Sequence, residues 1–379
     1  MAFRIERFPD TPEAKAAARR FNERLHAGGE TEFDLMESPF SRHRPEGPDS
    51  PMWQQYFLAI EEEREKPVEV RGGYLLQYQG YGRNGETTAA PHAFLRLPLS
   101  EGVVNKQYAA VGMLLLRDAM KRESNLCSLG MGGIHRPLPR LMAAMGWHVA
   151  EVPFSFLVLH PLAFLRQARV LRNKRFMAPL CDMAAWSGLG WLGLKALQFR
   201  LPAAPAPGIT VTCEAEFGPW ADAVWESSAP HYSFYGERNQ KLLNTLYSPD
   251  DPRWIRCVVR RDGQPAGWCL LLCTQTNNHK QFGSMRLGSI ADCLSAPADA
   301  ALVVRAAVAE LRRRGADVVV TNQLHQDWNT ALKKSGFLSG PSNFVWALSP
   351  SLKKQLEPLD TALPRAHINR GDGDGPINL

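Results

Sequence analysis

The chain has 379 residues, of which 45% are hydrophobic and 22% are charged. This composition is typical of folded globular proteins and excludes an intrinsically disordered chain. The length allows two domains of ordinary size with a connector between them. The net charge of +6 favours acidic partners in general, such as phosphorylated compounds or anionic lipid, without selecting one.

The N-terminal residues and the cysteines indicate a soluble cytoplasmic protein. Arg4 and Glu6 are not followed by an apolar run, so no signal peptide is expected. No window of about 18 uncharged apolar residues occurs, so no spanning helix is expected. The cysteines are odd in number and scattered, and we expect buried thiols of a reducing compartment rather than a disulfide framework or a metal site. They are Cys127, Cys181, Cys213, Cys257, Cys269, Cys273 and Cys293.

The first half of the chain predicts a hairpin followed by a helix and a strand. The residues after Gly73, Tyr74–Leu76, have the pattern of the second arm of an antiparallel hairpin. A helix is predicted from Val111 to Arg122, and the short apolar segment Leu126–Leu129 predicts a strand after it.

A connector of different composition follows. Residues 161–176 are basic, the apolar stretch after them holds Trp186 and Trp191, and residues 201–208 form a Pro/Ala linker. Cations beside interfacial tryptophans suit anionic lipid, so one hypothesis is peripheral membrane contact through residues 166–197. The alternative is an interdomain helix packed on both domains, which several glycines favour because they interrupt a clean amphipathic pattern.

The second half repeats the elements of the first. Asp262–Gly263 predicts a tight hairpin turn, and Trp268–Leu270 reads as the second arm. A helix is predicted from Asp299 to Arg314, with Gly315 as its stop signal, and Asp317–Val320 predicts the next strand.

A pair of histidines strengthens the internal repeat. His135 stands eleven residues before Gly146–Trp147, and His325 stands eleven residues before Gly336–Phe337, with a short helix expected between in each case. Each half therefore reads as hairpin, central strand, helix, strand, helix, strand. This order predicts an α/β fold (mixed α+β), with a parallel crossover around the longer helix.

The repeat also suggests where the domains lie. We expect an N-terminal domain over residues 1–160, a connector over 161–208, a C-terminal domain over 209–350 and a tail over 351–379. The run of alternating glycines at 370–375 predicts that the tail is flexible or loosely docked.

Over about residues 50–160 and 210–350 this order resembles the GNAT acyltransferase superfamily. The resemblance implies two GNAT-like domains in tandem, each a mixed, mostly antiparallel sheet flanked by helices. It also implies that a splayed central strand pairs with the pantetheine arm of acyl-CoA, and that the N-terminus of the following helix receives the pyrophosphate. No metal is implied.

The family's phosphate-binding signature, Gln/Arg-x-x-Gly-x-Gly/Ala, fits the first copy if Ala110 replaces the first glycine. Small residues at a helix N-terminus allow backbone N–H groups to approach an anion. The second copy reads Pro297–Leu302, without glycine and with Asp299 beside the phosphates, so we expect acyl-CoA in the first copy. The implied cofactor-binding residues are Gln107, Tyr108, Ala109, Ala110, Val111 and Gly112.

The sequence departs from the family at its catalytic positions. The positions of the family's Asn fall on His135 and His325, and those of the Tyr that protonates the leaving thiolate fall on Met142 and Leu332. Acyl transfer to an amine benefits from a general base, for which histidine is suited without much tuning. The alternative for each histidine is a helix-capping or surface role. Two acids near the ends of the central strands, Asp292 and Glu101, are the other candidate bases, and the alternative for them is a solvated acid.

These patterns predict an N-acyltransferase that moves an acyl group, with acetyl expected, from acyl-CoA to an amine such as an amino sugar, an amino acid or a lipid-linked amine. Two alternatives stay open: an acyl carrier protein as the donor, and a non-catalytic ligand-binding or scaffold protein. Tyr232, Phe234 and Tyr235 are candidates for an acceptor pocket or for the core. No basic stripe with interleaved aromatics occurs, so no nucleic-acid partner is expected.

Overall fold

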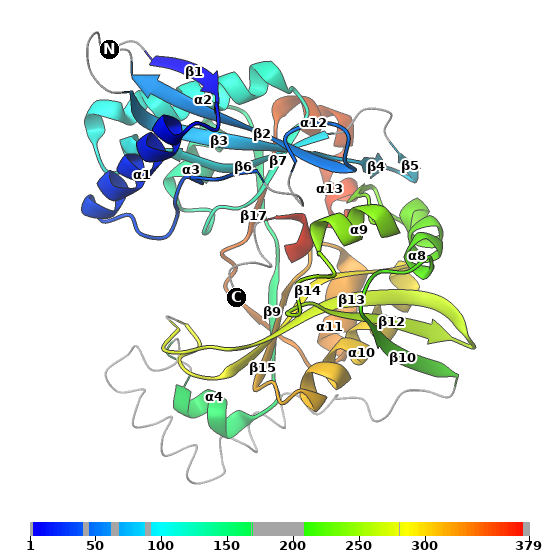
Figure 1. Cartoon of the computed structure of the whole chain (residues 1–379). Helices are drawn as coiled ribbons and strands as arrows, with labels where there is room; N and C mark the ends of the chain where they lie inside the picture. The colour runs from blue at the N-terminus through cyan, green and yellow to red at the C-terminus, as the bar shows by residue number, and fades with distance from the viewer. Residues whose placement is uncertain are drawn as a thin grey trace. The chain divides into compact units, whose positions relative to one another are not determined.

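The structure is a computed structural model that describes residues 3–40, 45–61, 68–87, 92–167, 169, 208–279 and 281–373. The chain forms two compact units (Figure 1). Unit 1 comprises Met1–Tyr81, Thr87–Glu151 and Asn343–Leu359, and unit 2 comprises Gly82–Glu86, Val152–Ser342 and Asp360–Leu379.

Unit 1 is built on a seven-stranded sheet of order β1-β2-β3-β6-β7-β17-β8. Neighbouring strands pair antiparallel except β6 and β7, which are parallel. The strands are β1 Phe3–Arg7, β2 Met52–Glu61, β3 Glu69–Gln79, β6 His92–Ser100, β7 Leu126–Gly130, β8 His148–Glu151 and β17 Val345–Leu348.

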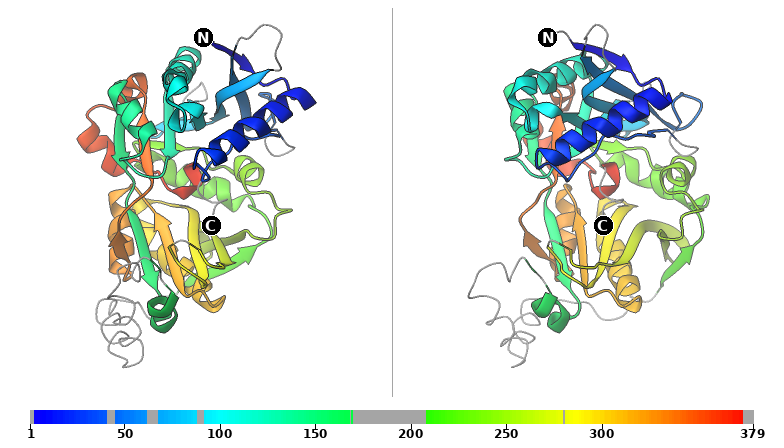
Figure 2. Two further views of the ribbon diagram at one scale, coloured as in Figure 1. Left: turned by 90° about the vertical axis from the view of Figure 1, so that its left-hand side faces the viewer. Right: turned by 60° about the vertical axis from the view of Figure 1, so that its left-hand side comes forward.

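Helices cover both faces of this sheet (Figure 2). On one face, Tyr56 and Leu58 of β2 pack with α1, which buries an apolar stripe that includes Phe21. On the other face, Phe57 of the same strand belongs to the core of α2, because successive strand residues point to opposite faces. The helices of unit 1 are α1 Pro12–Ala27, α2 Ala109–Arg122, α3 Pro137–Ala144 and α12 Pro350–Leu356.

Unit 2 is built on a second seven-stranded sheet, of order β10-β12-β13-β14-β15-β9-β16, with β14 and β15 as its parallel pair. The strands are β9 Phe154–Val158, β10 Ile209–Glu214, β12 Ile255–Arg261, β13 Gln264–Gln275, β14 Arg286–Ser295, β15 Val318–Asn322 and β16 Leu338–Gly340. The helices are α4 Pro161–Gln167, α8 Trp220–Ser228, α9 Gln240–Leu246, α10 Ala300–Arg313 and α11 Gln326–Lys334, and α13 spans Leu359–Ala362 at the junction of the two units. A small sheet joins β11 Phe234–Gly236 to β4 Tyr81–Arg83 and β5 Glu86–Thr87.

The two sheets confirm the internal repeat that the sequence predicts. Read from one edge, each sheet places its two hairpin strands, central strand and parallel partner in the same order. The predicted turn Asp262–Gly263 has φ of 49° and 82°, as a two-residue hairpin turn requires. Gly146 and Gly336 both have positive φ, 86° and 84°, directly after the short helices. Glycine adopts this conformation without a steric penalty, which explains the matching helix ends.

Each unit takes one strand from the other half of the chain. β9 follows the first copy in sequence but pairs with β15 and β16 of unit 2. β17 follows the second copy but pairs with β7 and β8 of unit 1. The compact units therefore differ from the continuous division at residues 160, 208 and 350 that we expected, because two strands cross between the sheets. Ser349, between β17 and α12, also contacts β7 of unit 1: its hydroxyl accepts a hydrogen bond from the Leu126 N–H at 3.0 Å.

The prediction of a flexible tail is wrong for the described residues up to 373. Ala366, His367, Ile368 and Asn369 are each at most 1% exposed. Hydrogen bonds to other residues of unit 2 hold this stretch through its backbone and side chains. Alternating glycines can allow a close approach of backbone as well as mobility.

The cysteines also differ in part from expectation. Cys213 is exposed and Cys273 is half-buried, while Cys127, Cys257, Cys269 and Cys293 are buried free thiols, and Cys181 lies outside the described residues. Most of the connector, with Trp186 and Trp191, also lies outside the described residues, so both hypotheses for residues 166–197 stay predictions. Among the helices of the described residues, none has the length and apolar character needed to cross a membrane.

Candidate active site

The parallel strands of unit 1 separate soon after they pair. Their register pairs are Ala93 with Leu126 and Phe94 with Cys127, and β6 then continues to Ser100. The Ser128 hydroxyl donates to the Leu95 carbonyl at 2.8 Å, just beyond the last pair. The strands are therefore splayed, with the carboxyl-terminal half of β6 turned away from β7.

A β-bulge in β6 accompanies this separation. Between the pairs Leu75–Arg96 and Gly73–Leu99, β6 has one more residue than β3. The extra residue falls at Leu97–Pro98, and proline suits a bulge because it has no N–H to donate to the ladder. The bulge bends the central strand next to the opening.

The start of α2 follows this strand after residues 101–108, which include the 3₁₀ turns Glu101–Val103 and Lys106–Tyr108. Lys106, Gln107, Ala109 and Ala110 are exposed, and the sequence has no acidic residue in the first turn of the helix. Tyr108 at the N-cap makes no side-chain capping hydrogen bond within the described residues. The Tyr108 and Ala109 N–H groups donate to the Asn105 and Lys106 carbonyls, and the positive dipole charge of the helix start favours an anion near Ala110.

The six predicted cofactor-binding residues divide into two groups. Gln107, Ala109 and Ala110 are exposed, whereas Tyr108 and Val111 are buried in the core. A Cβ at Gly112 would lie 3.6 Å from Leu141 and 3.7 Å from the Cβ of Ser100, inside the unit. The structure thus brings the six residues to one helix terminus, where Tyr108, Val111 and Gly112 could contribute backbone groups only.

Glu101 anchors the loop that precedes α2. Its carboxylate, 3% exposed, accepts from Arg71 Nη1 at 2.9 Å and from Arg24 Nε at 3.0 Å. Arg71 also lies 4.3 Å above the ring of Tyr108. With two guanidinium partners, Glu101 is a structural ion-pair residue. It is neither the solvated acid of the alternative nor a freely available base.

His135 lies in the loop between β7 and α3 and is exposed. The loop begins with Met131, Gly132 and Gly133, all with positive φ, so the chain turns sharply at the carboxyl end of β7. His135 therefore stands in the loop that follows one of the two splayed strands, with a side chain that solvent can reach. Its exposure matches the surface position that we considered as the alternative.

His325 is a helix cap. Its Nδ1 accepts the N–H of Asp327 at 3.1 Å at the N-terminus of α11, and its ring meets Tyr232 edge-on at 5.1 Å. Burial lowers the pKa of His325 to about 4. The ring is thus neutral near pH 7, and at such a pKa it is a weak proton acceptor.

This shift predicts a dependence of stability on pH. Because the folded-state pKa of His325 lies below its ordinary value, its contribution is present above about pH 6.5 and is lost as the pH falls toward 4. We expect His325→Asn, which can still cap a helix, to lose about 2.5 kcal/mol less stability than the wild type between pH 7 and pH 4.5. Urea unfolding at both pH values measures this difference, and equal losses in the two proteins would contradict the pKa assignment.

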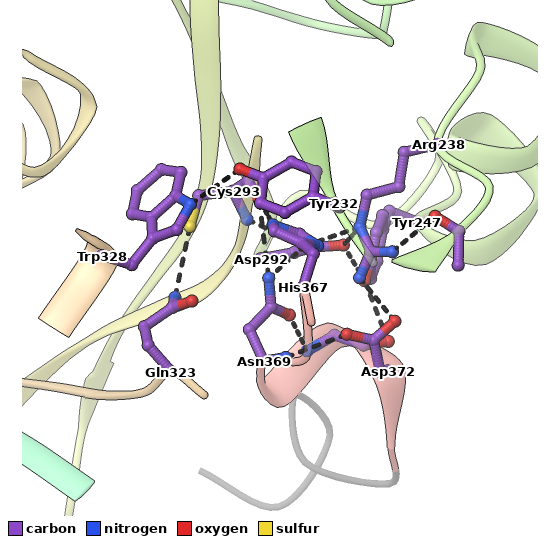
Figure 3. A network of polar contacts seen from close by, with 12 residues as sticks. Tyr232, Arg238, Tyr247, Asp292, Cys293, Gln323, Trp328, His367, Asn369 and Asp372 are labelled. Carbon is purple, nitrogen blue, oxygen red and sulfur yellow. Dashed lines mark hydrogen bonds and ion pairs between the residues drawn. The ribbon is translucent and has the colours of Figure 1, made fainter. Parts of the chain in front are cut away.

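Asp292 is fully engaged in a buried network in unit 2 (Figure 3). Arg238 Nε donates to both of its carboxylate oxygens at 3.0 and 3.1 Å, Tyr247 donates its hydroxyl proton at 2.8 Å, and Asn369 Nδ2 donates at 2.8 Å. Burial, and next the Asp292 carboxylate, raise the pKa of Tyr247 well above its ordinary value, so the phenol keeps its proton. Asp292 is 1% exposed, and its role is structural rather than that of the solvated acid or of an available base.

Sequence reasoning did not find the partners of Asp292. Arg238, Tyr247 and Asn369 lie 54, 45 and 77 positions away from it along the chain. Charges at such separations form no local motif. A charged residue in a β-strand with an apolar pattern is the one signal that a buried partner must exist.

The aromatic cluster near residue 232 belongs to the core. Tyr232 and Phe234 are fully buried and Tyr235 is 1% exposed. Tyr232 donates to the Ser295 carbonyl at 2.7 Å and accepts from Trp328 Nε1 at 2.9 Å. The core alternative is therefore correct, and these residues do not line an acceptor pocket.

A polar cavity lies between α8 and α9 in unit 2. Its volume is about 720 Å³, and carboxylates, carboxamides, one tryptophan and one lysine form its walls. Within the described residues, no group of three or more His, Cys, Asp or Glu side chains could hold a metal ion. The lining residues are Asp222, Trp225, Glu226, Asn239, Gln240, Lys241 and Asn244.

No family model matches the sequence, and no curated protein matches it. Solved structures do match its fold. A GCN5-related N-acetyltransferase from Anabaena variabilis aligns with a TM-score of 0.55 and 11% identity over 93% of this chain and 75% of that protein. Saccharomyces cerevisiae N-myristoyltransferase with bound myristoyl-CoA aligns with a TM-score of 0.53 and 11% identity, over 92% of this chain and 79% of that protein. A probable N-acyltransferase from Enterococcus faecalis aligns with a TM-score of 0.50 and 9% identity, over 94% of this chain and 75% of that protein.

These alignments extend over nearly the whole chain, so they include both sheets. At 9 to 11% identity they show the fold and leave the activity to be argued from the site. The splayed parallel strands, the bulged central strand and the helix that follows are features of one fold, repeated twice. The chain has the fold of GNAT N-acyltransferases in tandem.

Proposed function

We propose that this protein is an N-acyltransferase that uses acyl-CoA as donor and binds it in unit 1. The observation that carries the proposal is that the exposed start of α2 follows β6, the strand that separates from β7. In this proposal the extended pantetheine arm pairs with β6 beyond its last register pair with β7. The phosphates approach the first turn of α2 at the small, exposed Ala110, since the Ala109 N–H already donates to the Lys106 carbonyl. Exposed Lys106 adds a positive charge at the same terminus.

The reaction needs few protein groups. The amine of the acceptor attacks the thioester carbonyl, a C–N bond forms, the C–S bond breaks, and the thiolate leaves with the electron pair of that bond. The enzyme contributes by holding the two reactants together and by accepting the proton that the amine loses. Acetyl is the acyl group and an amino sugar, amino acid or lipid-linked amine is the acceptor in this proposal.

His135 is the residue that we assign as proton acceptor. Glu101 and Asp292 are occupied by guanidinium groups, and His325 caps a helix with a pKa of about 4. His135 alone among the four candidates has an exposed side chain, and it follows one of the two splayed strands of unit 1.

We expect His135→Gln to reduce kcat about 100-fold, which is typical for loss of a general base, while the affinity for acyl-CoA stays within twofold. Steady-state rates and donor binding are measured on the same preparation. The matched control is His231→Gln, because His231 is also exposed but lies in unit 2. Equal rates for His135→Gln and the control would remove His135 from the mechanism.

A turnover assay tests the proposed activity. Free thiol release is followed with acetyl-CoA, with a longer acyl-CoA and with an acyl carrier protein as donors, each against amino sugars and amino acids. Amine-dependent release of CoA, with an amide product identified by mass, supports the proposal. Release from the carrier protein alone would replace the donor, and no release from any donor would favour a non-catalytic ligand-binding role.

A further inference from the structure

Unit 2 has a counterpart of the opening in unit 1. The parallel pairing of β14 and β15 runs from Leu287–Val318 to Ser289–Val320, after which β14 continues to Ser295. β14 also has a bulge, at Ala291, because Leu270 pairs with Asp292 and the next residue, Leu271, pairs with Ile290. The second copy thus repeats both the splay and the bulge of the first.

This second opening is filled by residues 366–372, which we name the C-terminal segment. The His367 N–H donates to the Phe234 carbonyl at 2.8 Å, and the Leu324 N–H donates to the Ile368 carbonyl at 2.9 Å. His367 bridges to Tyr235 in parallel sense, and Asn369 bridges to Gln323 in antiparallel sense. The segment is therefore held by backbone on both sides, between β11 and the residues that follow β15.

Side chains of the segment also form hydrogen bonds with polar groups of β14 (Figure 3). His367 Nε2 lies 2.9 Å from the Cys293 carbonyl oxygen, where a neutral ring can donate, and Asn369 Nδ2 donates to Asp292. Asp372 forms an ion pair with Arg238 Nη2 at 2.7 Å. An acyl-CoA arm would have to displace these contacts to reach β14.

Gly371 shows how closely the segment is seated. A Cβ at this position would lie 2.5 Å from the carboxylate of Asp292 and 2.6 Å from the hydroxyl of Tyr247. Both groups are buried and held by further hydrogen bonds, so neither can move without breaking the network. Only glycine fits here, which indicates a site built around this backbone.

Unit 1 lacks such an insertion among its described residues. The isolated bridges of the described chain connect Tyr235 with His367, His279 with Gly283, and Gln323 with Asn369, and all six residues belong to unit 2. The two copies therefore share one sheet topology, but among the described residues only the opening of unit 2 contains an inserted segment.

We propose that the opening of unit 2 is a peptide-binding site whose ligand is the chain's own C-terminal segment, and that the protein consequently binds a single acyl-CoA. The second part rests on the proposed function, because it names the ligand that the segment excludes. The first part rests on the contacts of residues 366–372 alone. The second copy thus holds residues 366–372, and its candidate residue Asp292 serves that structure.

Hydrogen–deuterium exchange of the intact chain, with and without saturating acetyl-CoA, tests the proposal together with the binding stoichiometry from calorimetry. We expect peptides over residues 364–373 to be as protected as those of β14, unchanged by acetyl-CoA, and one equivalent to bind. Rapid exchange of these peptides, their deprotection by acetyl-CoA, or two equivalents bound would overturn it. Absence of binding would contradict the proposed function, while the exchange of residues 364–373 would still decide the peptide-binding site.

A substitution at Gly371 provides a second, independent measurement. Gly371→Val is expected to increase exchange of residues 366–372 at least tenfold while the peptides of β12 and β13 stay protected. Gly47→Val is the matched control, because a Cβ at Gly47 has no described atom within 4 Å. Unchanged exchange in Gly371→Val would contradict the seating of the segment, and the measurement on the intact chain stands whether or not this variant folds.

Discussion

Replacing Ala110 by Asp is expected to weaken acyl-CoA binding about 100-fold. Ala110 is exposed in the first turn of α2, where the proposed pyrophosphate site lies. A carboxylate about 6 Å from one phosphate charge costs roughly 3 kcal/mol at the effective dielectric constant of a protein surface, which corresponds to about 100-fold in affinity. The same carboxylate is favourable toward the helix dipole, so the variant should fold as well as the wild type. Calorimetric titration with acetyl-CoA measures the change.

Two control variants are needed: one distinguishes the effect of charge from the effect of side-chain volume, and the other distinguishes unit 1 from unit 2. Ala110→Asn adds nearly the same volume without charge and should bind within a few-fold of the wild type. Ala298→Asp places the same charge at an exposed position just before α10, in unit 2, and should leave the affinity unchanged. Weakening by Ala298→Asp, with Ala110→Asp unaffected, would move the donor to the second copy.

Replacing Arg238 by Met is expected to cost about 3–5 kcal/mol of unfolding free energy, because it leaves two buried carboxylates without their cation. Arg238, Asp292 and Asp372 have side chains between 1 and 3% exposed. Methionine fills similar space but cannot neutralise Asp292 or Asp372. Chemical unfolding at pH 7 measures the loss.

The pH dependence of the Arg238→Met variant gives a further check on the cause. Burial and the neighbouring Asp292 charge raise the pKa of Asp372, and loss of the guanidinium raises it further, so part of the lost stability should return as the pH falls through that raised value. Arg253→Met is the matched control: Arg253 pairs with Asp251 at 2.7 Å, but its side chain is 60% exposed, and such pairs contribute at most about 1 kcal/mol. A loss below about 1 kcal/mol in Arg238→Met would contradict the structural role of the network.

The features that the sequence predicts correctly depend on local signals. The hairpin turn at Asp262–Gly263 and the helix ends at Gly146 and Gly336 follow from residues that tolerate positive φ. The repeat of these signals at the same spacing is enough to predict two copies of one unit. The predicted chain order of hairpin, central strand, helix and strand is present in both copies.

The exchange of strands and the seating of the C-terminal segment are not local. Val345–Leu348 has the same apolar pattern whether it pairs within its own half or, as observed, with β7, more than 200 positions earlier. The glycine at 371 predicts mobility from composition, yet the structure uses it for close packing against Asp292. Such pairings are decided by the surface that each segment completes, which no short window of sequence contains.

The candidate site shows the same division. Small residues at a helix start predict the start of α2 as a phosphate-binding terminus; Ala109 and Ala110 are exposed there, whereas Tyr108 and Val111 are buried. Glu101 and Asp292 were candidate bases because each stands near the end of a central strand, and the arginines that occupy them come from distant elements. Their engagement could be known only from the fold.

Photo-crosslinking with a benzophenone thioester of CoA tests most directly whether the donor binds in unit 1. The label is attached to the intact protein, competed with acetyl-CoA and located by peptide mass spectrometry. We expect labelling that acetyl-CoA competes away within residues 94–100 or 127–135, the two sides of the β6–β7 opening. Labelling confined to residues 288–296 or 320–325, the corresponding strands of unit 2, would contradict it.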